Sequence, residues 1–182
     1  MTRRISIVLT TIFLVIFKHD NLYALEVSTH QAINLFISEG VFKGFSLDSY
    51  LKSELGITQG VKEIVSEDKN IQQWLELGGE YEDIPYLYMP YLRSVNHYHN
   101  PLTDRGFSGI FGGVFLSGMS AIDWATRPMG TQSPGGYFSW ADARNYYYLA
   151  LASFDGTGRD GHLADTFRGL GQLMHLVQDM SV

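Results

Sequence analysis

The chain has 182 residues, of which 45% are hydrophobic and 18% are charged. This balance is ordinary for a globular protein, so it excludes extensive disorder, and the length is that of one domain able to bury a core. The formal net charge of −6 disfavours nucleic acid as a partner, and the absence of cysteine excludes disulfides and a thiolate zinc site.

The N-terminal segment, residues 1–24, differs from the rest of the chain. Arg3 and Arg4 precede an apolar run over residues 5–17, and a short polar stretch leads to Ala24. A basic start followed by an apolar run too short for a comfortable membrane span is typical of a secretory signal peptide. We expect cleavage after Ala24 and a secreted or periplasmic mature protein. Without cleavage, the segment would be an N-terminal membrane anchor.

The first half of the remaining chain predicts helices joined by loops. Apolar residues at helical spacing and residues able to cap a helix indicate helices over 28–38, 46–55 and 60–77, the last broken near 66–68. Ser28 or Thr29 would cap the first helix and Ser46 the second. The first helix would bury Ile33, Leu35 and Phe36.

Between Gly78 and Gly118 the helical pattern is lost, and prolines and glycines become frequent. Long ordered loops of this kind are usually functional in compact domains. Helices are predicted again over 119–126, over 140–153 behind Ser139 as N-cap, and from Gly161 to the end of the chain. The fold class is therefore all-α, with long irregular loops.

The last predicted helix carries His175 and Asp179 one turn apart, next to apolar residues. Side chains at this spacing share one face of a helix, where an imidazole and a carboxylate can bind one Zn²⁺. Such pairs are also common as surface or capping pairs, so the spacing alone leaves both interpretations open.

Two further histidines, His97 and His99, lie in the irregular segment before Pro101, with Asn96, Tyr98 and Asn100 around them. In an extended chain, alternate residues point to opposite sides, so one imidazole would point inward as a metal ligand. A polar turn before Pro101 is the alternative.

Three acidic residues, Glu80, Glu82 and Asp83, follow the predicted end of the third helix. Carboxylates near a helix C-terminus oppose the helix dipole, and a bound cation would offset that cost. A solvated acidic loop is the alternative.

His30 lies five residues after Leu25, the expected mature N-terminus. The freed α-amino group and the carbonyl of Leu25 would then be able to chelate a metal that His30 also binds. A structural histidine on the first helix is the alternative.

Together these clusters resemble the bacterial zinc-dependent phospholipase C family and the related single-strand-specific fungal nucleases, which share an α-helical fold with three zinc ions. The matching segments are residues 29–34, 82–85, 96–101 and 168–182. The resemblance spans residues 25–182. It implies a secreted zinc metallohydrolase that cleaves phosphate esters with zinc-activated water, most closely a phospholipase C.

The resemblance also implies ligands for two zinc ions. The first set is Asp83, His97, His175 and Asp179. The second set is the amino group and carbonyl of Leu25, His30, and Asp179 as a bridge. Asp83 is preferred over Glu80 and Glu82 because its spacing to His97 is most similar to the family, and it would also orient or deprotonate the attacking water. Leu25 stands where family members usually have tryptophan.

In the family, a proline and further histidine and acidic ligands of a third zinc follow the position of Asp179, and these are missing here. We therefore expect residues 25–182 to be the N-terminal portion of such a domain, incomplete at its C-terminus, with up to two of three zinc ions. A non-catalytic zinc-binding remnant and a nuclease of the same fold are the alternatives. The expected partner is a phospholipid or other phosphodiester, with membrane contact through loop aromatics such as Phe111, and no protein partner is implied.

Overall fold

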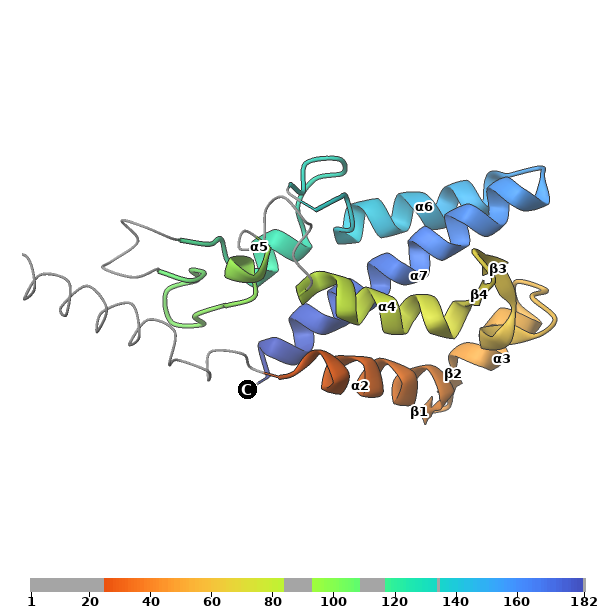
Figure 1. The fold of residues 1–182 in the computed structure, drawn as a ribbon, viewed down its shortest axis with the longest axis horizontal. Coiled ribbons are helices and arrows are strands. Elements are labelled where there is room, and N and C mark those ends of the chain that lie inside the picture. Colours follow the sequence, from red (N-terminus) through yellow and green to blue (C-terminus); the bar gives the residue numbers. More distant parts are fainter. Residues whose placement is uncertain (1–24, 84–92, 109–116, 134, 182) are drawn as a thin grey trace, which may run out of the picture.

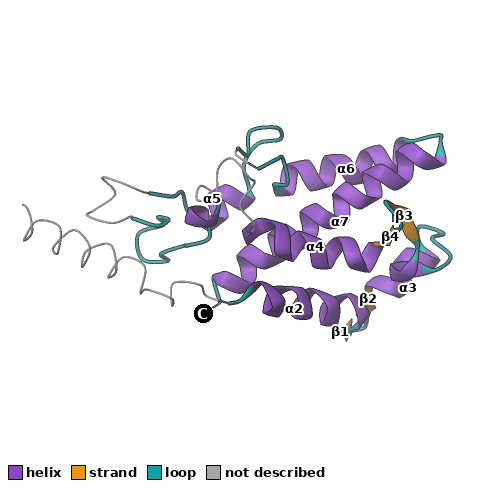
Figure 2. Ribbon diagram, in the orientation of Figure 1, coloured by secondary structure: helices purple, strands orange, loops and turns teal. Residues whose placement is uncertain are grey.

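The computed structural model describes residues 25–83, 93–108, 117–133 and 135–181. Over these ranges the protein is a set of packed α-helices with two short β-hairpins, which confirms the all-α class (Figure 2). Among the described helices, none has the length and apolar character needed to span a membrane. The predicted signal peptide over 1–24 and the loop residue Phe111 lie outside the described residues.

The N-terminal part of the fold is a helix, a hairpin and a second helix. Helix α2 spans Val27–Glu39, strands β1 (Val41–Phe42) and β2 (Phe45–Ser46) pair antiparallel, and α3 spans Leu47–Ser53. Lys43 and Gly44 have φ of 51° and 82°, the left-handed backbone that a two-residue hairpin turn requires. The Ser46 hydroxyl accepts a hydrogen bond from the Ser49 N–H, so the predicted cap of the second helix is confirmed.

The predicted helix over 60–77 is wrong in its first half. The chain there forms the short 3₁₀ helix η1 (Gly60–Lys62) and an antiparallel hairpin of β3 (Ile64–Ser66) and β4 (Lys69–Asn70), before α4 begins at Ile71. The turn residues Glu67 and Asp68 have positive φ, which no helix accommodates. Val61 and Val65 are both buried, and their spacing of four mimics a helix, although Val61 lies in η1 and Val65 in strand β3.

Helix α4 spans Ile71–Asp83 and runs through Gly78 and Gly79, where the sequence pattern predicted its end. A Cβ on Gly78 would lie 2.2 Å from the Arg168 carbonyl oxygen, and a Cβ on Gly171 would lie 2.2 Å from the Leu75 carbonyl oxygen. The two helices therefore touch backbone to backbone. Glycine is present because of this contact, and tertiary packing overrides its low helix propensity.

The C-terminal half contains α5 (Ala121–Ala125), α6 (Trp140–Ala152) and the long helix α7 (Gly156–Asp179). Ser139 caps α6 as predicted, in a reciprocal capping box with Asp142. Helix α7 begins before the predicted Gly161 because Asp155 caps it by accepting from the Gly158 N–H. Helix α7 packs against both α4 and α6, while α2 lies along α4, so the end of α7 lies beside the start of α2 (Figure 1).

The apolar core lies between α3, α4, α6 and α7, with Leu51, Ile71, Leu75 and Phe167 among its buried members. The inward face of α2 is instead polar, since its buried residues are His30, Asn34 and Ser38. Phe36, predicted for the core, is 67% exposed, and Ile33 and Leu35 are half-buried. That prediction was wrong for Phe36 because the spacing of apolar residues does not reveal a helix face that is buried by polar, hydrogen-bonded side chains.

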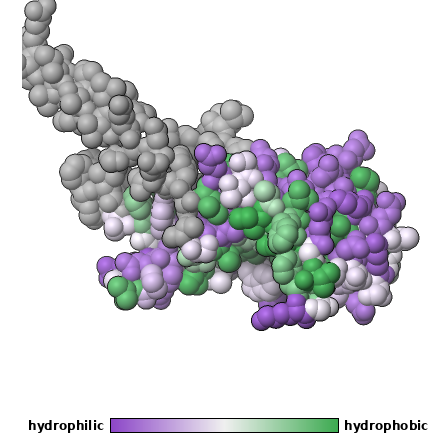
Figure 3. Space-filling view, turned by 90° about the horizontal axis from the view of Figure 1, so that it is seen from below, coloured by the Kyte–Doolittle hydropathy of each residue, from purple (hydrophilic) through white to green (hydrophobic). Residues whose placement is uncertain are grey.

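A groove of about 420 Å³ runs between α2, the β1–β2 hairpin, α6 and α7, with an almost entirely apolar lining. Ile37, Phe42, Phe45 and Trp140 line it and are also well exposed. Figure 3 shows apolar side chains gathered at the surface of the molecule seen from below. On this face, apolar side chains lie among hydrophilic ones (Figure 3).

Candidate metal centre

The predicted ligand side chains converge at the end of the helix bundle where α2 begins and α7 ends. They are His30 on α2, Asp83 at the end of α4, His97 directly after the 3₁₀ helix η2 (Ser94–Asn96), and His175 and Asp179 on α7. His30 and His175 are 0% exposed and His97 is 5% exposed. Segments far apart in the sequence thus bring three imidazoles and two carboxylates together.

These side chains form two overlapping groups, each with ligand atoms within 4.8 Å of one another. One group is His30, His175 and Asp179, and the other is Asp83, His97 and His175. His175 belongs to both groups, because its Nε2 lies 3.0 Å from Asp179 Oδ2 and 3.6 Å from Asp83 Oδ1. The arrangement suits one cation or two adjacent cations.

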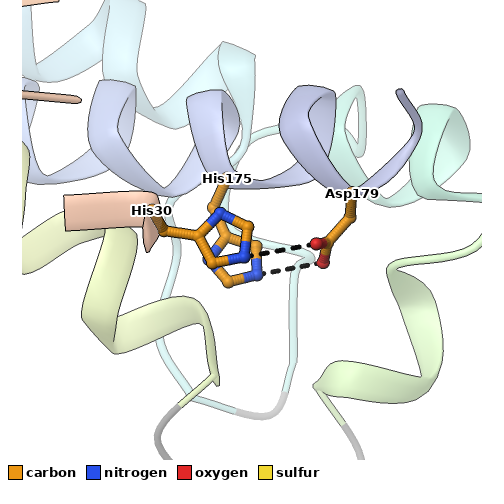
Figure 4. A group of neighbouring side chains, drawn as sticks. All are labelled: His30, His175 and Asp179. Atoms are coloured by element: carbon orange, nitrogen blue, oxygen red, sulfur yellow. Dashed lines mark ion pairs between the residues drawn. The ribbon is translucent and has the colours of Figure 1, made fainter. Parts of the chain in front are cut away.

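Asp179 contacts all three imidazoles. Its Oδ1 lies 3.2 Å from His30 Nε2, and its Oδ2 lies 3.0 Å from His175 Nε2 and 2.9 Å from His97 Nδ1. Figure 4 shows the His30 and His175 rings side by side, each directed at a different oxygen of the carboxylate. Asp179 therefore lies between the His30 ring and the His97 and His175 rings, and the bridging role that the resemblance implies stays a prediction.

The protonation of the His175 ring follows from its partner on α4. His175 Nδ1 lies 2.7 Å from the Gly79 carbonyl oxygen, which only accepts hydrogen bonds, so Nδ1 carries the proton. In the neutral ring, Nε2 then directs a lone pair at Asp179. Within the described residues, neither this Nε2 nor Asp179 Oδ1 has a partner with hydrogen-bond geometry. A lone pair facing a carboxylate at 3.0 Å is repulsive, and a cation shared by both atoms removes the repulsion.

The His30 and His175 rings stack, with centroids 3.6 Å apart and planes inclined by 20°. Two protonated rings at this separation would repel each other, so a shared cation balances the charge better than two ring protons do. The buried carboxylates Asp83 and Asp179 supply the negative charge that a divalent cation balances.

The electrostatics of the centre are dominated by burial and by these close pairs. Burial opposes a charge on His97, but its hydrogen bond to Asp179 and the nearby carboxylate of Glu82 raise its pKa to about 9. Burial likewise opposes ionisation of Asp179, but the three imidazoles hold its pKa well below the usual range. For Asp83, burial is the larger effect and raises the pKa. Without a metal, His97 is protonated at neutral pH, so protons compete with a cation for this centre.

The three acidic residues near the end of α4 have different positions. Asp83 reaches the cluster, whereas Glu80 accepts a hydrogen bond from Gln31 at 2.7 Å. Glu82 is completely buried, accepts from Arg93 at 2.7 Å, and lies with Oε1 3.6 Å from His97 Nε2. Among the three, Asp83 is the one whose carboxylate belongs to a candidate metal group.

Glu82 lies beside His97, on the side of the imidazole ring that faces away from Asp179. Trp124 Nε1 donates to Glu82 Oε1 at 2.9 Å, and Arg93 forms two hydrogen bonds to Oε2. Burial is the largest single effect and opposes the charge of Glu82, but Arg93, His97 and the Trp124 N–H together outweigh it and lower the pKa of Glu82 to about 2. An ionised carboxylate therefore faces the outer nitrogen of His97, the arrangement that orients histidine ligands in many metal sites.

Two other candidates are placed differently by the structure. His99 Nδ1 lies 2.8 Å from Ser120 Oγ, outside the described metal groups, so of the His97 and His99 pair only His97 points into the cluster. Leu25 lies just before α2, the helix that carries His30. Its ligand role remains a prediction, because it depends on cleavage at Ala24, outside the described residues.

Comparisons of the chain with protein-family models, with curated proteins and with solved structures gave no match. The centre is therefore interpreted from its own chemistry. Imidazole and carboxylate donors without thiolate can hold a divalent transition metal.

Sequence reasoning missed the residues around the ligands. Asn34 and Gln178 are buried and hydrogen-bonded beside His30, and Glu82 and Arg93 form a buried pair beside His97. A signal was available for Asn34, since it lies one helical turn after His30 and shares its face. The positions of Arg93 and Trp124 relative to Glu82 depend on tertiary structure, and no local pattern predicts them.

Proposed function

We propose that the chain is a zinc-dependent hydrolase of phosphate esters, of the phospholipase C type. The observation that carries the proposal is the convergence of three buried imidazoles and two carboxylates. Within the described part of the chain, His30 Nε2, His175 Nε2 and Asp179 Oδ1 face one another without a hydrogen-bond partner. The resemblance of the ligand-bearing segments to the zinc-dependent phospholipase C family supports the same conclusion.

Zinc is the metal that the donor set favours. Imidazoles at three positions disfavour Mg²⁺ and Ca²⁺, which prefer oxygen ligands. We assign Asp83, His97, His175 and Asp179 to one zinc. His30, Asp179 and the backbone of Leu25 would hold a second zinc once the segment before Leu25 is removed.

Zinc bound here would bring the pKa of a coordinated water close to neutrality and would withdraw charge from a phosphoryl oxygen. Asp83 is suited to orient that water or to accept its proton, because burial raises its pKa above the ordinary carboxyl value and its side chain is 11% exposed. The Glu82 carboxylate keeps His97 oriented, and the buried rings of His30 and His175 exclude water from the rear of the centre.

The proposed substrate is a phospholipid or another small phosphodiester, and the proposed location is outside the cytoplasm. The net charge of −6 disfavours a long nucleic acid, whose binding depends on basic side chains. A nuclease activity is therefore the weaker candidate for this centre.

The test combines metal analysis with a chromogenic assay. We expect the purified chain to retain zinc through dialysis and to hydrolyse p-nitrophenylphosphorylcholine faster than it degrades single-stranded DNA. His175→Ala should remove both zinc and activity. His162→Ala is the matched control, because His162 is on the same helix but outside the metal groups, and it should change neither.

Each outcome has a distinct meaning. Zinc binding without turnover of either substrate would overturn the hydrolase and support a non-catalytic zinc-binding protein. Equal zinc content in His175→Ala and the wild type would contradict the proposed metal centre itself. Faster turnover of DNA than of the phosphocholine ester would replace the phospholipase assignment with a nuclease.

A further inference from the structure

We propose that Asn34 and Gln178 are positioning residues that fix the proton of His30 on Nδ1 and so present Nε2 to the metal. The purpose of this arrangement rests on the proposed zinc centre, but the position of the proton can be measured without zinc. Two side-chain amides thus determine the tautomer of His30, although neither of them contacts Nε2, the atom that would bind the metal.

We call the chain of hydrogen bonds through the Asn34 and Gln178 side chains the amide relay. It begins at backbone carbonyl groups of α4 and α7. Asn34 Nδ2 donates to the Leu75 carbonyl oxygen at 2.9 Å and lies 3.3 Å from the Gly171 carbonyl oxygen. Both partners only accept hydrogen bonds, so the amide nitrogen of Asn34 must face them. The orientation of the Asn34 side chain is therefore determined, and its Oδ1 faces the other way.

The second step transfers that orientation to Gln178. Gln178 Nε2 donates to Asn34 Oδ1 at 2.8 Å, and an amide oxygen accepts from the nitrogen end of the neighbouring amide only. The oxygen end of Gln178 must then point away from Asn34. It lies 2.7 Å from His30 Nδ1.

The third step fixes the imidazole. Since Gln178 Oε1 can only accept, His30 Nδ1 must be the donor and carries the proton. Nε2 of the neutral ring is then the lone-pair atom, and it lies 3.2 Å from Asp179 Oδ1. His30 and Asn34 are completely buried and Gln178 is 8% exposed, so water does not readily substitute for either amide.

The neighbouring ring reaches the same form by a shorter route. His175 donates from Nδ1 directly to the Gly79 carbonyl oxygen. The two stacked rings therefore both present Nε2 to Asp179, one held by the backbone and the other by the amide relay (Figure 4). The relay is also neutral, so it orients His30 without adding a third negative charge beside Asp83 and Asp179.

The test follows the protein with ¹⁵N-labelled histidine, metal-free at alkaline pH, where the rings are neutral. In the wild type, the His30 shifts should report a protonated Nδ1 and an unprotonated Nε2. A proton on Nε2 of neutral His30 in the wild type would overturn the proposal whatever the chain does with zinc.

Three variants separate positioning from packing. Gln178→Leu removes the acceptor, so the His30 proton should redistribute between both nitrogens and zinc affinity should fall by about 10–100-fold. Gln178→Glu keeps an acceptor for Nδ1, so the wild-type tautomer should be restored. Gln172→Leu is the control. The Gln172 side chain is buried on the same helix and has no hydrogen-bond partner in the described chain, so its loss should leave the His30 tautomer and the zinc affinity unchanged.

The spectra of these variants can contradict the relay in two ways. A wild-type tautomer in a folded Gln178→Leu protein would overturn the relay, and so would a lost tautomer in Gln178→Glu. If Gln178→Leu fails to fold, the wild-type and Gln178→Glu spectra still decide the question. A wild type with the expected tautomer but no zinc binding would refute the proposed function and leave the relay standing.

Discussion

Replacing Gly78 by alanine tests the backbone contact between α4 and α7. A Cβ at this position would lie 2.2 Å from the Arg168 carbonyl oxygen, 2.8 Å from Gly171 Cα and 2.9 Å from the Gln172 nitrogen. All three are backbone atoms, so no side chain can rotate away. An ordinary van der Waals contact begins at 3.4 Å, and α4 and α7 must therefore separate by more than an ångström.

The change in the free energy of unfolding caused by Gly78→Ala is the sum of two opposing effects. Alanine is favoured over glycine inside a helix by about 1 kcal/mol, whereas overpacking in a tight interior costs roughly 1–3 kcal/mol. With three backbone clashes we expect the upper part of that range and a net destabilisation of about 2 kcal/mol. For a chain of this size, that lowers Tm by roughly 4–8 °C.

Urea and thermal unfolding followed by circular dichroism measure this effect. Gly161→Ala is the matched control, because Gly161 is inside α7 and a Cβ there meets nothing within 4 Å. It should stabilise the protein by about 0.5–1 kcal/mol. Zinc affinity should fall in Gly78→Ala alone, since separating the helices moves Asp83 away from His175. A Gly78→Ala protein as stable as Gly161→Ala would refute the close crossing.

Three further predictions concern the surroundings of the centre. Glu82→Ala leaves the buried guanidinium of Arg93 without its carboxylate, and chemical denaturation should show a loss of roughly 3–5 kcal/mol, against little change for Glu80→Ala. The pKa of His97 rises from 6.5 to about 9 on folding, so its protonation stabilises the metal-free fold below pH 6.5 and this contribution is lost as the pH rises through 9. Unfolding of the metal-free protein between pH 6 and pH 10 should show this loss, zinc affinity should increase over the same interval, and an unchanged profile in His97→Gln would contradict the assignment. Ser139→Ala removes the capping box of α6 and should cost about 1 kcal/mol in thermal unfolding, with no effect on zinc binding.

The sequence predicted those elements whose signals are local. Ser46 and Ser139 cap helices where expected, because a capping hydroxyl acts on a backbone N–H only three residues away. The predicted cap at Ser28 or Thr29 was wrong, because α2 begins at Val27 and both residues lie inside the helix. The five candidate ligand side chains could be selected from residue type and spacing together with a family resemblance, and the structure places them in two overlapping groups that could hold a metal ion.

Other features depend on contacts that no local pattern contains. Gly78 and Gly79 resemble a helix end until α7 is placed against them, and the inward face of α2 resembles a surface until Asn34 meets Gln178. The family resemblance already favoured Asp83 over Glu80 and Glu82, but the partners of the other two carboxylates, Arg93 for Glu82 and Gln31 for Glu80, depend on tertiary structure. Local propensity failed where the helices approach most closely and where buried polar groups replace apolar ones.

The contact between Gly78 and Gly171 also bears on how fast the centre forms. The two glycines are far apart in the sequence, so a long loop must close before α4 meets α7, and such non-local contacts slow folding. His175 and Asp179 reach Asp83 only after that closure. A cation held by these residues then acts on the finished structure, so it should slow unfolding while leaving the folding rate nearly unchanged. The lifetime of the folded chain, more than the speed with which it appears, would then depend on the metal supply of its surroundings.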